Sequence, residues 1–130
     1  MREENQARNG QKTPPAITNN VIASALGKAV SLHMSGKPKE ALAELNAALE
    51  NGPGSVEMYS ARGHIQFELE MYDDAAKSYS SLLEQAPTHP TGAFNLAVCL
   101  EKLGRWQQAS QRFQKAIEID PLGPAFNLYF

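Results

Sequence analysis

The chain repeats itself every 34 residues, and this period limits the folds open to it more than any other feature. Each copy has an alanine, a large apolar or aromatic residue four places later, another apolar residue three places after that, and a closing proline. These residues are Ala41, Ala75 and Ala109; Leu45, Tyr79 and Phe113; Ala48, Leu82 and Ala116; and Pro53, Pro87 and Pro121. A repeat of this length indicates stacked units rather than one closed core, and stacked units usually present a surface to another chain.

Apolar residues recur at three- and four-residue steps between the breakers of the chain, which predicts amphipathic helices. The first helix is expected to begin between residues 17 and 20 and to stop at Ser35-Gly36, where glycine suits the left-handed C-cap geometry. The other five are expected over about 38–51, 55–70, 72–86, 91–103 and 106–119, with Ser55 as an N-cap. Because no segment alternates with the two-residue period of a strand, the predicted fold is all-α, with six helices in three antiparallel pairs.

The domain organisation follows from composition along the chain. Residues 1–17 are polar, carry mixed charge and include Pro14-Pro15, so we expect a disordered leader there. The repeat domain is expected over 18–123, with repeats at about 22–55, 56–89 and 90–123. Residues 124–130 form a tail that is either a truncated next helix or the remnant of a cleavage tag, and we expect the sequence to be an excerpt of a longer protein.

Composition excludes several classes of protein. The formal net charge of −2 and an isoelectric point near 5.9 argue against a nucleic-acid partner, which needs a clustered basic excess. No apolar run approaches the roughly 18 residues of a membrane span, and the N-terminus has no apolar segment like that of a signal peptide. The lone Cys99 suits a reducing compartment, so we expect a cytoplasmic protein without a membrane partner.

These repeated residues resemble the tetratricopeptide repeat, a helix-turn-helix unit of 34 residues. The family has a small residue midway along the first helix of each unit, and here the matching positions are Ala29, Gly63 and Ala97. It also has a glycine at the turn between the helices, matched by Gly36 and Gly104, whereas Glu70 stands there in the middle unit. The resemblance implies three tandem repeats in a right-handed superhelix, with the first helix of each unit on the concave side.

In this family the concave groove binds short extended peptides or helices. By the register of the repeats, the expected peptide-binding residues are Leu26, Val30, Met34, Glu57, Ser60, His64, Phe67, Glu68, Phe94, Asn95, Val98 and Glu101, and the same register adds Ala23, His33, Thr91 and Lys102. Six of these make an apolar stripe, namely Leu26, Val30, Met34, Phe67, Phe94 and Val98. Glu57, Glu68 and Glu101 form an acidic rim, which favours an apolar or amphipathic segment that carries a lysine or arginine.

The resemblance also allows one ligand class to be set aside. Heat-shock co-chaperones of the family hold a C-terminal carboxylate with lysine, arginine and asparagine, and the matching positions here are Leu26, Val30, Ala61, Thr91 and Asn95. Without cations the desolvation of a carboxylate goes uncompensated, so we do not expect this binding. Two alternatives to an open groove remain: the apolar stripe belongs to the core between helices, or the leader or tail of the chain fills the groove.

Sequence spacing gives no sign of catalysis. There is no HExxH or CxxC pattern and no glycine-rich phosphate loop, so we expect no catalytic residue, no metal site and no cofactor. His64 and Glu68 lie four residues apart on one helix face and are expected to pair on a binding surface. Cys99 is expected to be a buried, unreactive thiol.

The sequence therefore predicts a chaperone-like adaptor for protein–protein interaction, similar in repeat number to the three-repeat chaperones of type III secretion. The partner is a protein or peptide whose identity the sequence does not specify. Two alternatives stay open: a homo-oligomerising scaffold that assembles through the ends of the array, by the last repeat and the apolar tail, and a regulatory module of a longer enzyme.

Overall fold

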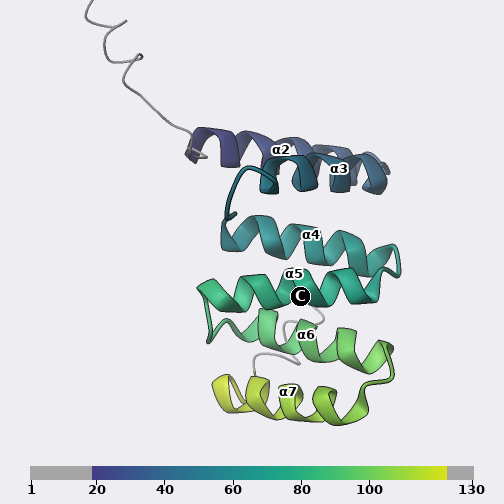
Figure 1. The fold of residues 1–130 in the computed structure, drawn as a ribbon, viewed down its shortest axis with the longest axis vertical. Coiled ribbons are helices and arrows are strands. Elements are labelled where there is room, and N and C mark those ends of the chain that lie inside the picture. The colour runs from purple at the N-terminus through teal and green to yellow at the C-terminus, as the bar shows by residue number, and fades with distance from the viewer. Residues whose placement is uncertain (1–18, 123–130) are drawn as a thin grey trace, which may run out of the picture.

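The computed structural model describes residues 19–122, with side chains from residue 24 onward, and within this range every regular element is a helix. The helices are α2 (Asn19–Met34), α3 (Pro38–Leu49), α4 (Val56–Glu68), α5 (Tyr72–Gln85), α6 (Pro90–Lys102) and α7 (Trp106–Ile119). Figure 1 shows them stacked one beneath another, with α2 and α3 at one end and α7 at the other. The predicted all-α fold of three helical hairpins is confirmed, although α3 and α4 each end two residues earlier than expected. The predicted leader and tail lie outside the described residues.

The turn within each hairpin has the same hydrogen bonds. The N–H three residues beyond the end of the helix reaches back to a carbonyl in its last turn: Lys37 to Leu32 at 2.9 Å, Met71 to Gln66 at 2.8 Å, and Arg105 to Leu100 at 2.9 Å. This arrangement needs a left-handed residue just before that N–H. Gly36 and Gly104 supply it with φ of 78° and 77°, and Glu70 adopts the same conformation with φ of 62°.

The starts of two helices show how sequence sets an element's boundary. The Oγ of Ser55 accepts the Met58 N–H at 3.2 Å, which confirms Ser55 as the N-cap of α4. His89 caps α6, because its Nδ1 accepts the Gly92 N–H at 2.9 Å. A histidine is an unusual cap, and the sequence did not predict it.

The small residue midway along the first helix of each hairpin lies where the second helix packs closest. Ala29 and Ala97 are fully buried there. In the middle hairpin, a Cβ added to Gly63 would lie 2.8 Å from Cζ of Tyr79, so the aromatic ring occupies the volume of the missing side chain. The close approach that the sequence predicted is therefore present.

The core has two parts. One cluster joins α2, α3 and α4 through Ala29, Ala41, Leu42, Leu45, Met58 and Ile65. The other joins α5, α6 and α7 through Ala75, Ala76, Tyr79, Leu82, Leu96, Cys99, Leu100 and Ala109. Helices α3 and α4 approach each other less extensively than α5 and α6 do, so the junction between the first and second hairpins is the thinner of the two.

Candidate functional site

All twelve residues predicted for the groove lie on α2, α4 and α6, the first helix of each hairpin. Half of them are exposed: Val30, Met34, Glu57, His64, Glu68 and Glu101. The other half are partly buried: Leu26, Ser60, Phe67, Phe94, Asn95 and Val98. The face thus offers solvent a mixture of apolar and acidic side chains, while part of the predicted stripe turns toward neighbouring helices.

The two phenylalanines of the predicted stripe pack against aromatic rings of the helices that follow them. Phe67 meets Tyr72 edge to face, with ring centroids 5.1 Å apart, and Phe94 meets Phe113 in the same way at 5.4 Å. Leu26 packs against the core of the first two hairpins. These three residues support the fold as well as lining the face, as the alternative of an inter-helix core anticipated.

Asn95 has a partner within the fold. Its side chain hydrogen-bonds the hydroxyl of Tyr79, whose pKa is raised mainly by burial and secondarily by Cys99, with the Asn95 bond acting in the opposite direction. An amide already engaged with Tyr79 is not free to hold a peptide backbone or carboxylate without first breaking this bond. Asn95 therefore contributes to the packing of the second and third hairpins.

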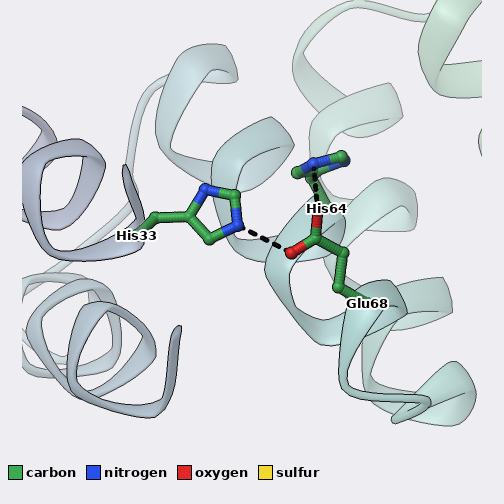
Figure 2. Close-up of side chains that lie close together, drawn as sticks. All are labelled: His33, His64 and Glu68. Atoms are coloured by element: carbon green, nitrogen blue, oxygen red, sulfur yellow. Dashed lines mark hydrogen bonds and ion pairs between the residues drawn. The ribbon is translucent and has the colours of Figure 1, made fainter. Parts of the chain in front are cut away.

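The structure brings together three polar residues of the face, shown in Figure 2. His33 of α2 and His64 of α4 both point at the carboxylate of Glu68, with Nε2 of His33 2.7 Å from Oε1 and Nε2 of His64 3.0 Å from Oε2. An ionised carboxylate only accepts hydrogen bonds, so each Nε2 carries the donated proton. The hydrogen bond from His33 is the main reason that the pKa of Glu68 is lowered.

The predicted pair of His64 and Glu68 is present, but it is only part of this cluster. His33 lies 35 residues before Glu68, and its ring meets that of His64 at right angles, with centroids 5.7 Å apart. Spacing along the chain did not reveal the three-residue arrangement, because it depends on how α2 lies against α4. The only signal in the sequence was that all three residues share the predicted groove face.

A pocket of about 660 Å³ lies elsewhere, between α5 and α7. It is lined by Asp73, Ala76, Lys77, Ser80, Ser81, Leu96, Leu100, Arg105, Gln108, Gln111 and Arg112. Leu96 and Leu100 lie on the side of α6 opposite Phe94 and Val98, so the pocket opens on the other face of the array. Arg105 and Asp73 form an ion pair across its edge at 3.5 Å. Sequence reasoning did not predict this pocket.

The one thiol of the chain is buried. Cys99 has no exposed surface and lies in the core cluster of α5, α6 and α7. Burial raises its pKa to about 12, so the thiol stays protonated at neutral pH. Since the thiolate is the reactive form, the expectation of an unreactive core cysteine agrees with the structure.

Comparisons with known proteins agree with the helical repeat seen here. A model of the tetratricopeptide repeat family matches residues 66–128. Among curated proteins, the chain is 24% identical over 97 residues to the protein CTR9 homolog of Arabidopsis thaliana. That match covers 74% of this chain but only 9% of the length of the relative.

Several solved structures share the fold. The crystal structure of MamA aligns with a TM-score of 0.72 and 18% identity, over 77% of this chain and 58% of that one. The type III secretion chaperone SycD of Yersinia enterocolitica, in complex with a peptide of the translocator YopD, aligns with a TM-score of 0.74 and 22% identity, over 87% and 86% of the two chains. YrrB, described as a TPR protein with an unusual peptide-binding site, aligns with a TM-score of 0.69 and 25% identity, over 76% of this chain and 51% of that one.

None of the six helices between residues 19 and 122 combines the length and the hydropathy needed to cross a membrane. Four findings point to the same fold. They are the 34-residue period, the paired packing with a small residue at each close approach, the left-handed turn in each hairpin, and the match to the family model. The described residues therefore form three tandem helical hairpins with the fold of the tetratricopeptide repeat family, whose model matches residues 66–128.

Proposed function

We propose that this chain is a protein-interaction adaptor that binds an apolar or amphipathic peptide segment along the face of α2, α4 and α6. The observation that carries the proposal is the exposure of Val30 and Met34, which leave 44% and 81% of their surface in water. They lie four residues apart, so they form one patch on the face of α2. An exposed apolar patch rimmed by polar groups is typical of a surface that binds a partner.

The charges of this face favour a basic residue in the partner. Glu57 and Glu101 are exposed on α4 and α6, and the His33–His64–Glu68 cluster lies between the ends of α2 and α4. A peptide that places apolar residues on Val30 and Met34 can therefore direct a lysine or arginine toward Glu57 or Glu101. The positions that would hold a C-terminal carboxylate remain without a lysine or arginine. Such a carboxylate is therefore not the proposed ligand.

Proteins of the same fold support peptide binding in general. The SycD structure contains a peptide of the translocator YopD, and YrrB is described by its peptide-binding site. At these identities the similarity supports the fold and the class of activity, and the groove residues proposed here rest on exposure and charge in this chain. Within the proposal the chain binds and does not catalyse, and its location is the cytoplasm.

The test uses residues whose substitution leaves the core intact. A displayed library of short random peptides is selected on the immobilised chain, and the affinity of one selected peptide is then measured by calorimetry. Met34→Glu and Val30→Glu should each weaken that affinity about tenfold or more, because each buries a charge under the apolar part of the peptide. Phe67 and Phe94 are poorer choices, since both also support the fold. The proposal fails if both variants bind as the wild type does.

A second candidate function, homo-oligomerisation through the end of the array, has an observation of its own. Trp106 and Ile117 on α7 are 67% and 56% exposed, and Leu122 beyond the helix is 81% exposed. Trp106 and Ile117 lie eleven residues apart, three helical turns along one face, with the half-buried Phe113 between them. A second copy that packs on this face would cover all three side chains of α7.

Met34→Glu and a second variant, Ile117→Glu, separate peptide binding from homo-oligomerisation. Ile117→Glu should leave the affinity for the selected peptide unchanged and serves as the control for Met34→Glu. Light scattering then measures the mass of both variants. A wild-type oligomer that Ile117→Glu dissociates and Met34→Glu leaves intact supports the scaffold, whereas a monomeric wild type contradicts it.

A further inference from the structure

We propose that His33, His64 and Glu68 form a Zn²⁺ site, with the Nε2 atoms of the two histidines and the carboxylate of Glu68 as ligands. The side chains come from two repeats, His33 from α2 and the other two from α4 (Figure 2). The proposal departs from the expectation of no metal site, which considered only spacing along the chain.

The geometry already places the ligand atoms near one another. The atoms that each of the three residues would offer all lie within 4.8 Å of one another, and the two nitrogens lie 2.7 and 3.0 Å from the carboxylate oxygens. Zinc bonds of about 2.0–2.2 Å in a tetrahedron put ligand atoms about 3.3 Å apart. The nitrogen–oxygen distances must therefore open by about 0.3–0.6 Å.

The side chains can make these movements. His64 is exposed, as is Glu68, and neither is packed into a core cluster. The two imidazole rings lie edge to face with centroids 5.7 Å apart, and we expect the exposed His64 ring to reorient when the metal binds. The hydrogen bonds to Glu68 are exchanged for bonds to the metal, and each Nε2 gives up its proton to solvent or to Nδ1.

The chemistry of the ligand set favours a transition metal such as zinc over magnesium and calcium. Two imidazole nitrogens and one carboxylate are the ligands of open zinc sites, in which a water fills the fourth position. Magnesium and calcium require mostly oxygen ligands and are not expected to bind here with comparable affinity. Because the cluster is exposed, the fourth position faces solvent on the side of the array that carries Val30 and Met34.

A metal ion at this position would link the first two repeats. His33 is the only ligand from the first hairpin, and it reaches Glu68 at the contact between α2 and α4. Because zinc would bind fully only when the first two repeats are docked, its binding would stabilise the docked state by mass action. Zinc should therefore raise the thermal midpoint of the chain, and it should do so only when His33 is present.

The experiment titrates ZnCl₂ into the full chain without a histidine tag and measures binding by calorimetry. We expect one Zn²⁺ per chain. His33→Gln, His64→Gln and Glu68→Gln should each raise the dissociation constant at least about tenfold, since even indirect supports of a metal ligand cost 10- to 100-fold. The zinc-dependent rise in thermal midpoint should disappear in the same three variants.

The chain contains a matched control, because its third histidine lies outside the cluster. His89→Asn removes that imidazole and retains a side chain able to cap α6, so this variant should bind zinc as the wild type does. Glu101→Gln is the corresponding control for an exposed carboxylate on the same face. Circular dichroism of all five variants without metal checks that the helices are retained.

A second measurement reports the geometry of the site. Cobalt(II) in place of zinc should give the intense visible absorption of a four-coordinate centre in the wild type and in His89→Asn, and a weaker band in His33→Gln. The proposal is overturned if the wild type binds no zinc, or if His33→Gln binds it as tightly as the wild type. It is also overturned if cobalt gives the same visible spectrum in the wild type and in His33→Gln. None of these outcomes depends on whether the chain binds a peptide.

Discussion

At the scale of single residues, the turn of the middle hairpin shows how a family position tolerates the wrong amino acid. Glu70 occupies the place of Gly36 and Gly104, and it adopts the left-handed conformation with φ of 62°. For a residue with a Cβ this conformation costs roughly 1–2 kcal/mol. The hydrogen bonds of the turn are nevertheless made, at 2.9 Å from the Glu70 N–H and 2.8 Å from that of Met71. Packing of the hairpin therefore outweighs the local preference.

Replacing Glu70 with glycine should stabilise the chain. We expect Glu70→Gly to raise the free energy of unfolding by about 1 kcal/mol, because glycine adopts this conformation without steric cost. Denaturant titration followed by circular dichroism measures the change. Glu70→Gln is the control, since it removes the charge and keeps the Cβ. An equal gain from both variants would mean that charge, not backbone conformation, is the cause.

Gly63 should respond in the opposite way to the usual exchange of glycine for alanine in a helix. An added Cβ would lie 2.8 Å from the ring of Tyr79, which is buried and tied to Asn95, so Gly63→Ala should destabilise the chain by about 1–3 kcal/mol. Gly27, on the exposed side of α2, has open space around it, and Gly27→Ala should stabilise by about 0.5–1 kcal/mol. Thermal unfolding of the two variants compares them directly, and equal signs would contradict the packing described here.

At the scale of the elements, a polar network joins α3 of the first repeat to α4 and α5 of the middle repeat. Nε of Arg62 donates to Oγ of Ser78 at 2.9 Å, and that hydroxyl donates to Oε1 of Gln66 at 2.6 Å. Arg62 also reaches Oδ1 of Asn46 on α3 at 3.3 Å. Ser78 and Gln66 are buried, so their hydrogen bonds must be satisfied inside the protein.

Removing one member of this network should cost more than removing two. Ser78→Ala removes the side-chain partner of the buried Gln66 and one of the two partners of Arg62, so it should lower the free energy of unfolding by about 1–3 kcal/mol. Gln66→Leu combined with Ser78→Ala should recover at least half of that loss, because leucine stands at the matching position of the other two repeats, Leu32 and Leu100. Chemical denaturation of the single and double variants provides the comparison. A double variant less stable than Ser78→Ala would contradict this expectation. It would show that the hydrogen bonds of the network contribute more free energy than burying its polar groups costs.

The element containing Cys99 carries the clearest dependence on pH. Its thiol, with a pKa raised to about 12 by burial, should react with a disulfide reagent at pH 8 only as fast as the helix opens, and rapidly once denaturant is added. The sign for stability follows from the same shift. The protonated thiol favours the fold below its ordinary pKa near 9, and this contribution is lost as the pH rises toward 12. Cys99→Ala should lose less stability over that interval, and an immediate reaction of the folded wild type would contradict the burial.

Features of the fold and of the candidate site could be predicted from the sequence where they depend on contacts between residues close in the chain or at fixed repeat positions. The cap at Ser55, the glycine turns and the small residue at Gly63 depend on neighbours in sequence or on a fixed position in the repeat, and all three were predicted correctly. The convergence of His33 on Glu68 was not, because it depends on the angle between two helices in different repeats. Phe67 was placed on the groove face by register, but register says nothing of its contact with Tyr72. The peptide-binding role of the groove residues stays a prediction.

At the scale of the whole molecule, the array is unevenly bound together. One core cluster unites α2, α3 and α4, the other unites α5, α6 and α7, and α3 meets α4 less extensively than α5 meets α6. In a repeat array, stability is approximately the sum of each unit and its contact with its neighbour. We therefore expect amides of α2 and α3 to exchange with deuterium faster than those of α5 and α6. Uniform protection from Ala25 to Ile119 would contradict this expectation.

An array joined in this way can lose its first hairpin while the remaining helices stay folded. Such a partial unfolding would expose Met58 and Ile65, which α2 and α3 now cover. It would also free the connection over residues 50–55, with its glycines and proline, as an early target for proteases. We therefore expect proteolysis of the protein to begin at the thin junction between the first two repeats.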